Sequence, residues 1–301
     1  MLNNVRKNSG IRLERPSWLK KKLILDENIA WVNYNLNKLS LHTVCQEAMC
    51  PNQAECFKDG TATFLIMGRV CTRNCTFCAI EHGKPDMIDP LEPANVAKAV
   101  FLMQLKYAVI TSVTRDDLLD GGANHYAKTT HEIRQMNPGA KVELLIPDFK
   151  GSLNSLSVVM KAIPDVLNHN LETVPSLYRF VRPQADYSRS LKLIRDVKHI
   201  NPNSVTKSGI MIGLGESSEE VLMLFDDLRE ARCDILTIGQ YLQPSHHHYP
   251  VKEYIHPGVF KFYENEAKKR GFKGVTSAPF VRSSYKAYEL FENVMQPSVI
   301  P

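Results

Sequence analysis

Three cysteines within eight residues, Cys71, Cys75 and Cys78, form the stretch of this sequence that is best suited to chemistry. A 4Fe-4S cluster has four iron corners, so three cysteine ligands would hold it and leave one iron free for a substrate or cofactor. Zinc is the alternative, but a structural zinc site normally takes four protein ligands arranged as CxxC pairs. The triplet therefore favours an iron–sulfur cluster with one open iron over a zinc knot.

The spacing CxxxCxxC, with Phe77 directly before the last cysteine, resembles the signature of the radical SAM superfamily. In that superfamily the open iron chelates the amino and carboxylate groups of S-adenosylmethionine, and one-electron reduction cleaves the sulfonium to a 5'-deoxyadenosyl radical. The resemblance implies that Cys71, Cys75 and Cys78 hold the catalytic cluster and that Phe77 belongs to the cofactor site.

A second triplet, Cys45, Cys50 and Cys56, lies a short distance upstream of the first. Two adjacent triplets indicate two clusters. A binuclear zinc site shared by all six thiols is the alternative, although this spacing contains no CxxC pair. The seventh cysteine, Cys233, ends an amphipathic segment and is interpreted as a small buried hydrophobe without a role.

The composition is that of a globular protein from a reducing compartment. A chain of 301 residues with 44% apolar content can bury a full core, and one α/β barrel can occupy that length. The N-terminus has no apolar stretch of the kind found in secretory signals, and no run is long enough to cross a bilayer. Clustered, unevenly spaced cysteines argue against a disulfide framework. We expect bacterial cytoplasm or an organelle, and no membrane association.

The net charge of +5 is spread along the chain, with the densest clusters at 20–22 and 268–270. Neither cluster has the form of a nucleic-acid-binding arm, so no nucleic-acid partner is expected. Solvated helix faces are the favoured interpretation of both clusters. The alternative is that they steer an acidic protein partner, such as an electron donor or a carrier domain.

The upstream triplet, the segment Gly-Thr-Ala-Thr-Phe at 60–64 and the CxxxCxxC motif together resemble lipoyl synthases. The resemblance covers nearly the whole chain after residue 10, and it continues in segments 114–123, 168–174, 241–245 and 281–285. Ala278 and Lys286 depart from the family, which often has Gly and His there. Neither departure concerns an expected ligand.

Lipoyl synthases insert two sulfur atoms into an octanoyl chain carried on a lysine of a small acidic carrier domain. The resemblance implies that this chain makes C–S bonds at C6 and C8 and uses two molecules of S-adenosylmethionine, with electrons from a low-potential donor such as ferredoxin or flavodoxin. The cluster on Cys45, Cys50 and Cys56 would donate the sulfur. Its fourth iron would be bound by Ser284, in the Arg-Ser-Ser-Tyr motif at 282–285, for which a capping turn is the alternative.

The rest of the sequence predicts a barrel that positions these residues. Between 61 and 281, short β-type apolar runs alternate with helical patterns such as those at 94–105 and 219–231. Strands are expected at 63–67, 107–113, 142–146, 166–170, 208–212 and 235–241. Six βα units predict an α/β fold, a partial (β/α)6 TIM-like barrel with N-terminal and C-terminal extensions.

We expect the chain to consist of three parts. Residues 1–60 form an N-terminal extension that carries the auxiliary-cluster cysteines, and residues 61–270 form the radical SAM barrel. Residues 271–301 fold back to the auxiliary cluster, because only such a path brings Ser284 to the distant cysteines. The first cysteine motif follows the first barrel strand, at the carboxyl end where barrels of this kind place their reactive groups.

Three further segments resemble S-adenosylmethionine contacts. Gly121 and Gly122 follow the second strand, where the superfamily meets the cofactor's amino group, and an ordinary turn is the alternative. Gly213 and Glu216, in a glycine pattern at 209–216, resemble the segment near adenine.

The third segment is the end of the fourth strand, where the polar residues Asn168, Asn170 and Glu172 alternate and would face the barrel interior. There Glu172 could bind ribose hydroxyls, and a solvated strand end is the alternative. The run of three histidines at 246–248 is interpreted as a loop, because adjacent histidines cannot all point at one ion.

Two other functions compete with this interpretation. A biotin-synthase-like enzyme also joins a radical cluster to a sacrificial one, but it lacks the cysteine triplet placed just upstream. A non-catalytic zinc-binding protein would show zinc in place of iron and sulfide. Anaerobic metal and sulfide analysis distinguishes the two classes, because two cubane clusters require about eight irons per chain.

Overall fold

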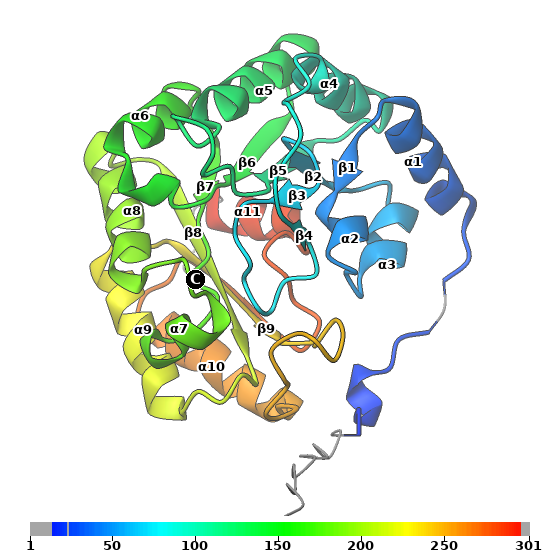
Figure 1. Cartoon of the computed structure of the whole chain (residues 1–301). Coiled ribbons are helices and arrows are strands. Elements are labelled where there is room, and N and C mark those ends of the chain that lie inside the picture. The colour runs from blue at the N-terminus through cyan, green and yellow to red at the C-terminus, as the bar shows by residue number, and fades with distance from the viewer. Residues whose placement is uncertain (1–13, 23, 296–301) are drawn as a thin grey trace, which may run out of the picture.

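A mainly parallel sheet that curls into an open barrel organises the residues that this computed structural model describes, 14–22 and 24–295 (Figure 1). The strand order is β1-β2-β5-β6-β7-β8-β9-β10, so β1 and β10 form the two edges. β1 (His42–Thr43) is antiparallel to β2, and the other neighbours pair in parallel. The parallel strands are β2 (Thr63–Ile66), β5 (Tyr107–Ser112), β6 (Lys141–Leu145), β7 (Val166–Asn168), β8 (Val205–Ile212), β9 (Ile235–Gln240) and β10 (Gly274–Ser277).

All six strands expected from the sequence are present, and the partial-barrel fold class is confirmed. β7 ends at Asn168, earlier than expected. Beyond it the chain leaves the sheet, and Glu172, with a left-handed φ of 66°, returns through a single bridge to Ile210. β10 is a seventh parallel strand that the sequence did not predict, because its four residues lie in the stretch assigned to the C-terminal segment.

Helices follow successive strands and cover the outer face of the barrel (Figure 1). The two expected at 94–105 and 219–231 are confirmed as α4 and α9. α9 begins with a capping box, in which the Ser217 hydroxyl accepts from the Glu220 amide and the Glu220 carboxylate accepts from the Ser217 amide. None of the helices in the described ranges is long and apolar enough to span a membrane. The outer helices are α4 (Glu92–Leu102), α5 (Ala123–Met136), α6 (Leu153–Lys161), α8 (Tyr187–Ile200), α9 (Ser218–Glu230) and α10 (Pro257–Lys269).

Short elements complete the chain and lie near the barrel openings or edges. They are η1 (Ser17–Leu19), α1 (Glu27–Lys38), α2 (Val44–Glu47), α3 (Gln53–Lys58), β3 (Val70–Cys71), β4 (Glu81–His82), η2 (Phe149–Gly151), η3 (Pro175–Leu177) and α7 (Tyr178–Val181). β3 and β4 pair in parallel and enclose the cysteine loop between them.

The last helix, α11 (Ala287–Met295), closes the amino-terminal end of the barrel. Its residues Ala287 and Phe291 pack against Tyr107, Val109 and Val166, which lie at the beginnings of β5 and β7. The segment before α11 must therefore run through the barrel interior. Of the expected terminal extensions, residues 1–13 and 296–301 lie outside the described residues, and the proposed division at 60 and 270 stays a prediction.

A buried polar network fills the interior above α11. Lys207 Nζ lies 3.0 Å from both carboxylate oxygens of Glu143, which also accept hydrogen bonds from Tyr107 (2.7 Å) and Asn168 (2.8 Å). The side chains of Lys207 and Glu143 are each only 1% exposed. Because a buried charge is stable only when paired, these residues tie β5, β6, β7 and β8 to one another.

We predict that Glu143→Leu lowers the free energy of unfolding by about 3–5 kcal/mol, because it leaves the Lys207 ammonium buried without a carboxylate. Anaerobic urea denaturation followed by circular dichroism measures the change. The matched control is Lys192→Met, which removes an exposed helical ion pair with Asp196 and should cost about 0.5 kcal/mol or less. Equal losses in the two variants would contradict the structural role of the network.

Candidate functional site

A single cavity of about 810 Å³ inside the barrel is lined by all six cysteines of the two triplets. The two triplets come from different elements. Cys71 ends β3, and Cys75 and Cys78 lie in the loop that follows it, whereas the second triplet lies on α2, α3 and their connection. Of the other residues singled out from the sequence, Phe77, Asn170, Glu172 and Ser284 also line this cavity. The fold therefore brings the two candidate cluster sites to one cavity.

In the loop of the first triplet, backbone amides donate to one thiol and burial raises the pKa of the other two. The Cys71 sulfur accepts hydrogen bonds from the amides of Arg73 (3.4 Å) and Thr114 (3.2 Å). Burial raises the pKa of Cys75, and it raises the pKa of Cys78 to about 12. The neighbouring thiols raise both pKa values further. Iron binding offsets the free-energy cost of ionising these buried thiols, because a coordinated thiol is deprotonated outright.

Arg73 clamps this loop to the carboxyl ends of β5 and β6. Its guanidinium donates to Asp116 (Nε–Oδ2 2.7 Å) and to Asp148 (Nη2–Oδ1 2.6 Å). The Asp148 carboxyl is fully buried, and although burial alone would raise its pKa, the hydrogen bond and charge of Arg73 lower the pKa to about 2. These residues fix the position of the loop that carries the first triplet.

Sequence reasoning missed this clamp, although its parts were visible. Arg73 stands between the cysteines, and Asp116 belongs to the 114–123 segment that carries the family resemblance. It also missed His248, whose ring nitrogens lie 2.8 Å from the Ser245 hydroxyl and 3.1 Å from the Cys78 carbonyl. The histidine run is a loop, as expected, and it packs against the cysteine loop.

The second triplet is built on two short helices joined by a tight connection. Thr43 caps α2 by accepting from the Gln46 amide, which places Cys45 in the first turn. The Cys50 amide then donates to the Cys45 carbonyl at 3.1 Å. Burial raises the pKa of Cys45 to about 12 and the pKa of Cys56 to about 11, and the Cys50 thiol raises both. All three cysteines of this triplet line the cavity.

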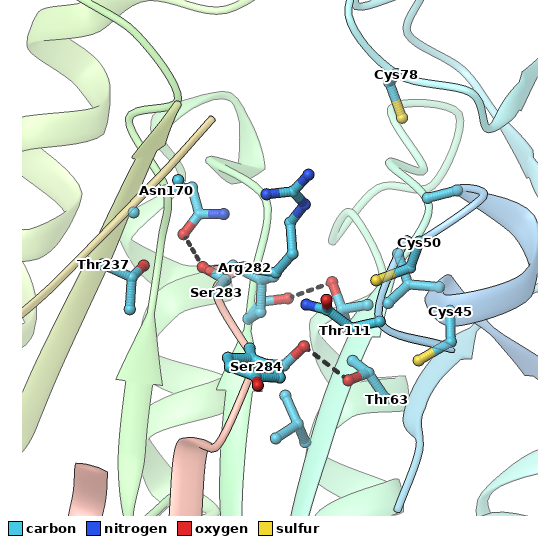
Figure 2. Close-up of a pocket in the computed structure, with 18 of the residues that line it drawn as sticks. Cys45, Cys50, Thr63, Cys78, Thr111, Asn170, Thr237, Arg282, Ser283 and Ser284 are labelled. Carbon is cyan, nitrogen blue, oxygen red and sulfur yellow. Dashed lines mark hydrogen bonds between the residues drawn. The ribbon is translucent and has the colours of Figure 1, made fainter. Parts of the chain in front are cut away.

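The segment before α11 brings two serines into the barrel on opposite sides (Figure 2). Ser284 accepts a hydrogen bond from the Thr63 hydroxyl at 2.8 Å, and this pair lies on the side of Cys45 (Figure 2). Ser283 instead donates to the Asn170 amide oxygen at 2.6 Å. Of the two serines, Ser284 is thus the one on the side of the second triplet.

Two further hydrogen bonds hold the C-terminal segment against the second triplet. Tyr285 donates to the Glu55 carboxylate at 2.5 Å, and the Asn52 side chain donates to the Phe280 carbonyl at 2.7 Å. Lys21 binds both Asn52 and Glu55 from outside. The expected return of the chain to the cysteines is therefore present.

The polar residues after β7 line the opposite wall. The Asn170 side chain donates to Glu172 at 3.0 Å, and Arg182 donates to the Asn170 carbonyl at 3.0 Å. Burial raises the pKa of Glu172, while the charge of Arg182 and the Asn170 hydrogen bond oppose that rise. Asn168 does not reach the cavity lining, because its side chain belongs to the buried network around Glu143.

Four of the expected cofactor residues do not line the cavity: Gly121, Gly122, Gly213 and Glu216. A Cβ atom on Gly122 would lie 2.2 Å from the Met67 sulfur, so this glycine permits a close packed turn before α5. The Glu216 carboxylate folds back on the amides of Gly213 (2.5 Å) and Leu214 (2.9 Å). Their assignment to S-adenosylmethionine stays a prediction.

The arrangement of the thiols differs from that of a site for a single zinc ion. Among the described residues, no three His, Cys, Asp or Glu side chains meet closely enough to hold a single metal ion. A zinc ion needs its ligands to converge on one point. A cubane binds each thiolate through a different iron, so its ligands surround a volume instead. Each triplet supplies three thiols to the cavity, which is the number of ligands for three irons of a cubane cluster.

Comparison with known proteins agrees with this arrangement. Residues 65–228 match the family model of the radical SAM superfamily, and residues 1–50 match the model of the N-terminal domain of lipoyl synthase. The lipoyl synthase of Caldicellulosiruptor bescii is 55% identical over 285 residues, which cover 94% of this chain and 98% of that protein. The lipoyl synthase of Alkaliphilus metalliredigens is 52% identical over 278 residues, covering 92% and 96%. The chain belongs to the lipoyl synthase family.

Lipoyl synthases are radical SAM enzymes that insert sulfur and use S-adenosylmethionine with two 4Fe-4S clusters, so this chain is a sulfurtransferase. Family membership sets aside the biotin-synthase-like and zinc-binding alternatives. Solved structures support the fold at low sequence identity. HydG, a maturase of the FeFe hydrogenase, superposes with a TM-score of 0.58 at 13% identity over 76% of this chain and 54% of that one. SuiB from Streptococcus suis bound to S-adenosylmethionine gives 0.54 at 14% identity over 83% and 64%.

We predict that Asp148→Asn removes a pH-dependent part of the stability of this lipoyl synthase family member. The folded pKa of about 2 lies below the ordinary value of 3.8, so the stabilisation is complete above about pH 4 and is lost as the pH falls towards 2. The parent should lose about 2 kcal/mol more than the variant across that interval. Urea denaturation at a series of pH values measures it, and parallel curves for the two proteins would contradict the Arg73 clamp.

Proposed function

We propose that this lipoyl synthase inserts sulfur at C6 and C8 of an octanoyl chain carried on a lysine of a carrier domain. The observation that carries the proposal is that both cysteine triplets open into the same cavity of about 810 Å³. A carbon radical formed beside the first triplet would have to react with a sulfur source at the second triplet before it reacted with solvent. This requires that both triplets open into the same cavity. Two sulfur atoms require two molecules of S-adenosylmethionine.

Cys71, Cys75 and Cys78 would hold the radical cluster and leave one iron open. S-adenosylmethionine bound to that iron supplies the radical that removes hydrogen atoms from the octanoyl chain. The protein supplies orientation and excludes water. Phe77 lies beside the cysteines, and the Asn170–Glu172 pair offers acceptors for the ribose hydroxyls from the facing wall.

The apolar part of the cavity wall is suited to an octanoyl chain. Val109 on β5, Ile210 on β8 and Ile146, which directly follows β6, contribute to it. Burial of apolar surface would hold the chain, and the C-terminal segment would close the space below it. These residues would place C6 and C8 between the two triplets.

Cys45, Cys50, Cys56 and Ser284 would hold the auxiliary cluster that donates sulfur. The geometry of Ser284 suits a ligand that can be released. Thr63 donates to the Ser284 oxygen, so this hydrogen bond persists when the serine loses its proton to bind iron, and it then stabilises the alkoxide. An alkoxide is a harder ligand than a thiolate, and reprotonation frees it. Loss of that iron would open the cluster for sulfur transfer.

The remaining parts of the proposal concern partners and setting. The carrier domain would be acidic, and the electron donor would be a low-potential protein such as ferredoxin or flavodoxin. The acidic character of the carrier is inferred from the family and not from the net charge of this chain. We propose a reducing compartment, bacterial cytoplasm or an organelle, because oxidation of the six clustered thiols would prevent cluster assembly.

We predict that single substitutions separate the two clusters. Cys75→Ala should abolish 5'-deoxyadenosine formation, because two thiolates do not hold the open-iron cubane in place. Cys50→Ala should leave this cleavage largely intact and eliminate dithiolation of an octanoylated carrier. Liquid chromatography measures the nucleoside and mass spectrometry measures the carrier, after anaerobic reconstitution with about eight irons per parent chain. Normal dithiolated product from Cys50→Ala would refute the assignment of the sulfur donor.

We predict that Ser284→Cys gives a sturdier auxiliary cluster and a slower enzyme, because a thiolate retains the fourth iron more persistently than an alkoxide does. Iron release under a chelator and the rate of dithiolation should therefore both fall. Ser283→Ala is the matched control, because this neighbour bonds Asn170 on the other side of the segment. If Ser284→Ala keeps the parent rate and cluster spectrum, serine ligation is wrong. If only Ser283→Ala destroys both, the other serine is the ligand.

A further inference from the structure

Three arginines line the cavity. Arg15 is exposed, whereas Arg182 and Arg282 are partly buried, and neither of these two forms an ion pair within the described residues. Arg73 shows the contrast, because two carboxylates neutralise its buried guanidinium. Burial lowers the pKa of Arg282, and the charge of Glu172 opposes that fall; burial also acts against the charge of Arg182, which Tyr178 and Glu172 favour. A guanidinium enclosed without an anion is strongly disfavoured. The cavity is therefore built to receive negative charge.

The position of Arg282 is fixed by its own backbone. Its Nη1 donates to the carbonyls of Val281 (2.6 Å) and Pro279 (3.4 Å), and the Val281 carbonyl packs so closely on Gly239 that a Cβ there would lie 2.1 Å away. These contacts use one corner of the guanidinium. The side chain extends into the space between Asn170 and Cys50 (Figure 2), so its other donors face the cavity.

The two arginines serve different triplets. Arg282 extends towards Cys50 of the second triplet (Figure 2), whereas Arg182 directly follows Val181, whose carbonyl accepts a hydrogen bond from the Thr76 amide in the loop of the first triplet. Arg182 is also held by the carbonyls of Asn170 and Leu171 on the far wall. Arg282 shares its segment with Ser284, which faces the second triplet. Arg182 and Arg282 therefore lie beside different candidate cluster sites.

We propose that Arg282 is the counter-ion of the auxiliary cluster on Cys45, Cys50 and Cys56, and that its fixed positive charge raises the reduction potential of that cluster. This inference rests on the proposed function. Three thiolates and an alkoxide outweigh the positive charge of the oxidised core, so the site carries net negative charge. A nearby cation stabilises the reduced form further, because reduction adds another negative charge. Arg282 would thus be a positioning residue that acts through charge.

A raised potential suits a sulfur donor. When a carbon radical forms a bond to a bridging sulfide, the C–S bond uses one electron of the radical and one from the sulfide, and the irons accept the electron left over. The transfer therefore reduces the cluster by one electron, without any other oxidant. Arg282 would favour this outcome at the auxiliary site, while Arg182 lies on the side of the radical cluster.

The test is an anaerobic redox titration, followed by electron paramagnetic resonance, of the full chain loaded with both clusters. The reduction step that persists in Cys75→Ala identifies the auxiliary cluster. Arg282→Gln should lower the midpoint potential of that step at unchanged iron and sulfide content. Arg282→Lys should restore a value close to the parent, because the charge returns. The control Arg182→Gln should leave the auxiliary potential unchanged.

Several outcomes would overturn the proposal. An unchanged auxiliary potential in Arg282→Gln shows that the charge is not felt, and an equal fall in Arg182→Gln shows a general effect of the cavity. If Arg282→Gln fails to retain the auxiliary iron, Arg282→Lys must restore loading, and loss in both variants refutes a role through charge. A parent chain with only one cluster refutes the proposed function instead, and the parent iron and sulfide count reports that separately.

Discussion

The hydrogen bond from Thr63 to Ser284 joins the first barrel strand to a segment 221 residues later in the chain, and the site depends on that connection. It is possible only because α11 closes the amino-terminal end of the barrel, which sends the preceding segment through the interior. The same segment contacts the second cysteine triplet through Tyr285 and Phe280. The C-terminal segment is thus both the floor of the cavity and part of one candidate cluster site.

Burial of the thiols imposes the next constraint. In the protein alone, burial is the main cause that raises the pKa values of Cys45 and Cys78 to about 12, and the neighbouring thiols raise both values further. Thiolates are nevertheless the ligands that iron requires. A cavity that keeps its cysteines protonated until metal arrives couples cluster assembly to deprotonation, so cluster binding contributes directly to the stability of the loops that carry the triplets. The Arg73 clamp holds one of those loops in place without metal.

The features that the sequence predicts well are those with local signals. Buried β-type runs located six strands, and the two triplets marked the site, because both patterns lie within short stretches of chain. The β10 strand escaped because four residues carry too little periodicity. The glycines at 121, 122 and 213 resembled cofactor contacts, yet the structure keeps them out of the cavity lining, because a glycine pattern does not reveal which backbone it packs against. Asp148 carries no local signal, since its partners Arg73 and Arg189 come from distant elements. Ser284 came from family resemblance alone, and its bond to Thr63 supplies the physical argument.

The charges of the cavity explain why one space can hold two clusters with different tasks. Iron–sulfur potentials depend on nearby charge, hydrogen bonds and solvent, and all three are set by side chains that the two sites do not share. Arg73 and the Thr114 amide surround the first triplet, whereas Ser284 and Thr63 border the second. Glu172 and Asn170 stand on the wall between Arg182 and Ser283, and through these two residues they connect the sites. The chain can therefore adjust each site separately, while the common apolar wall keeps the reacting carbon atoms within reach of both.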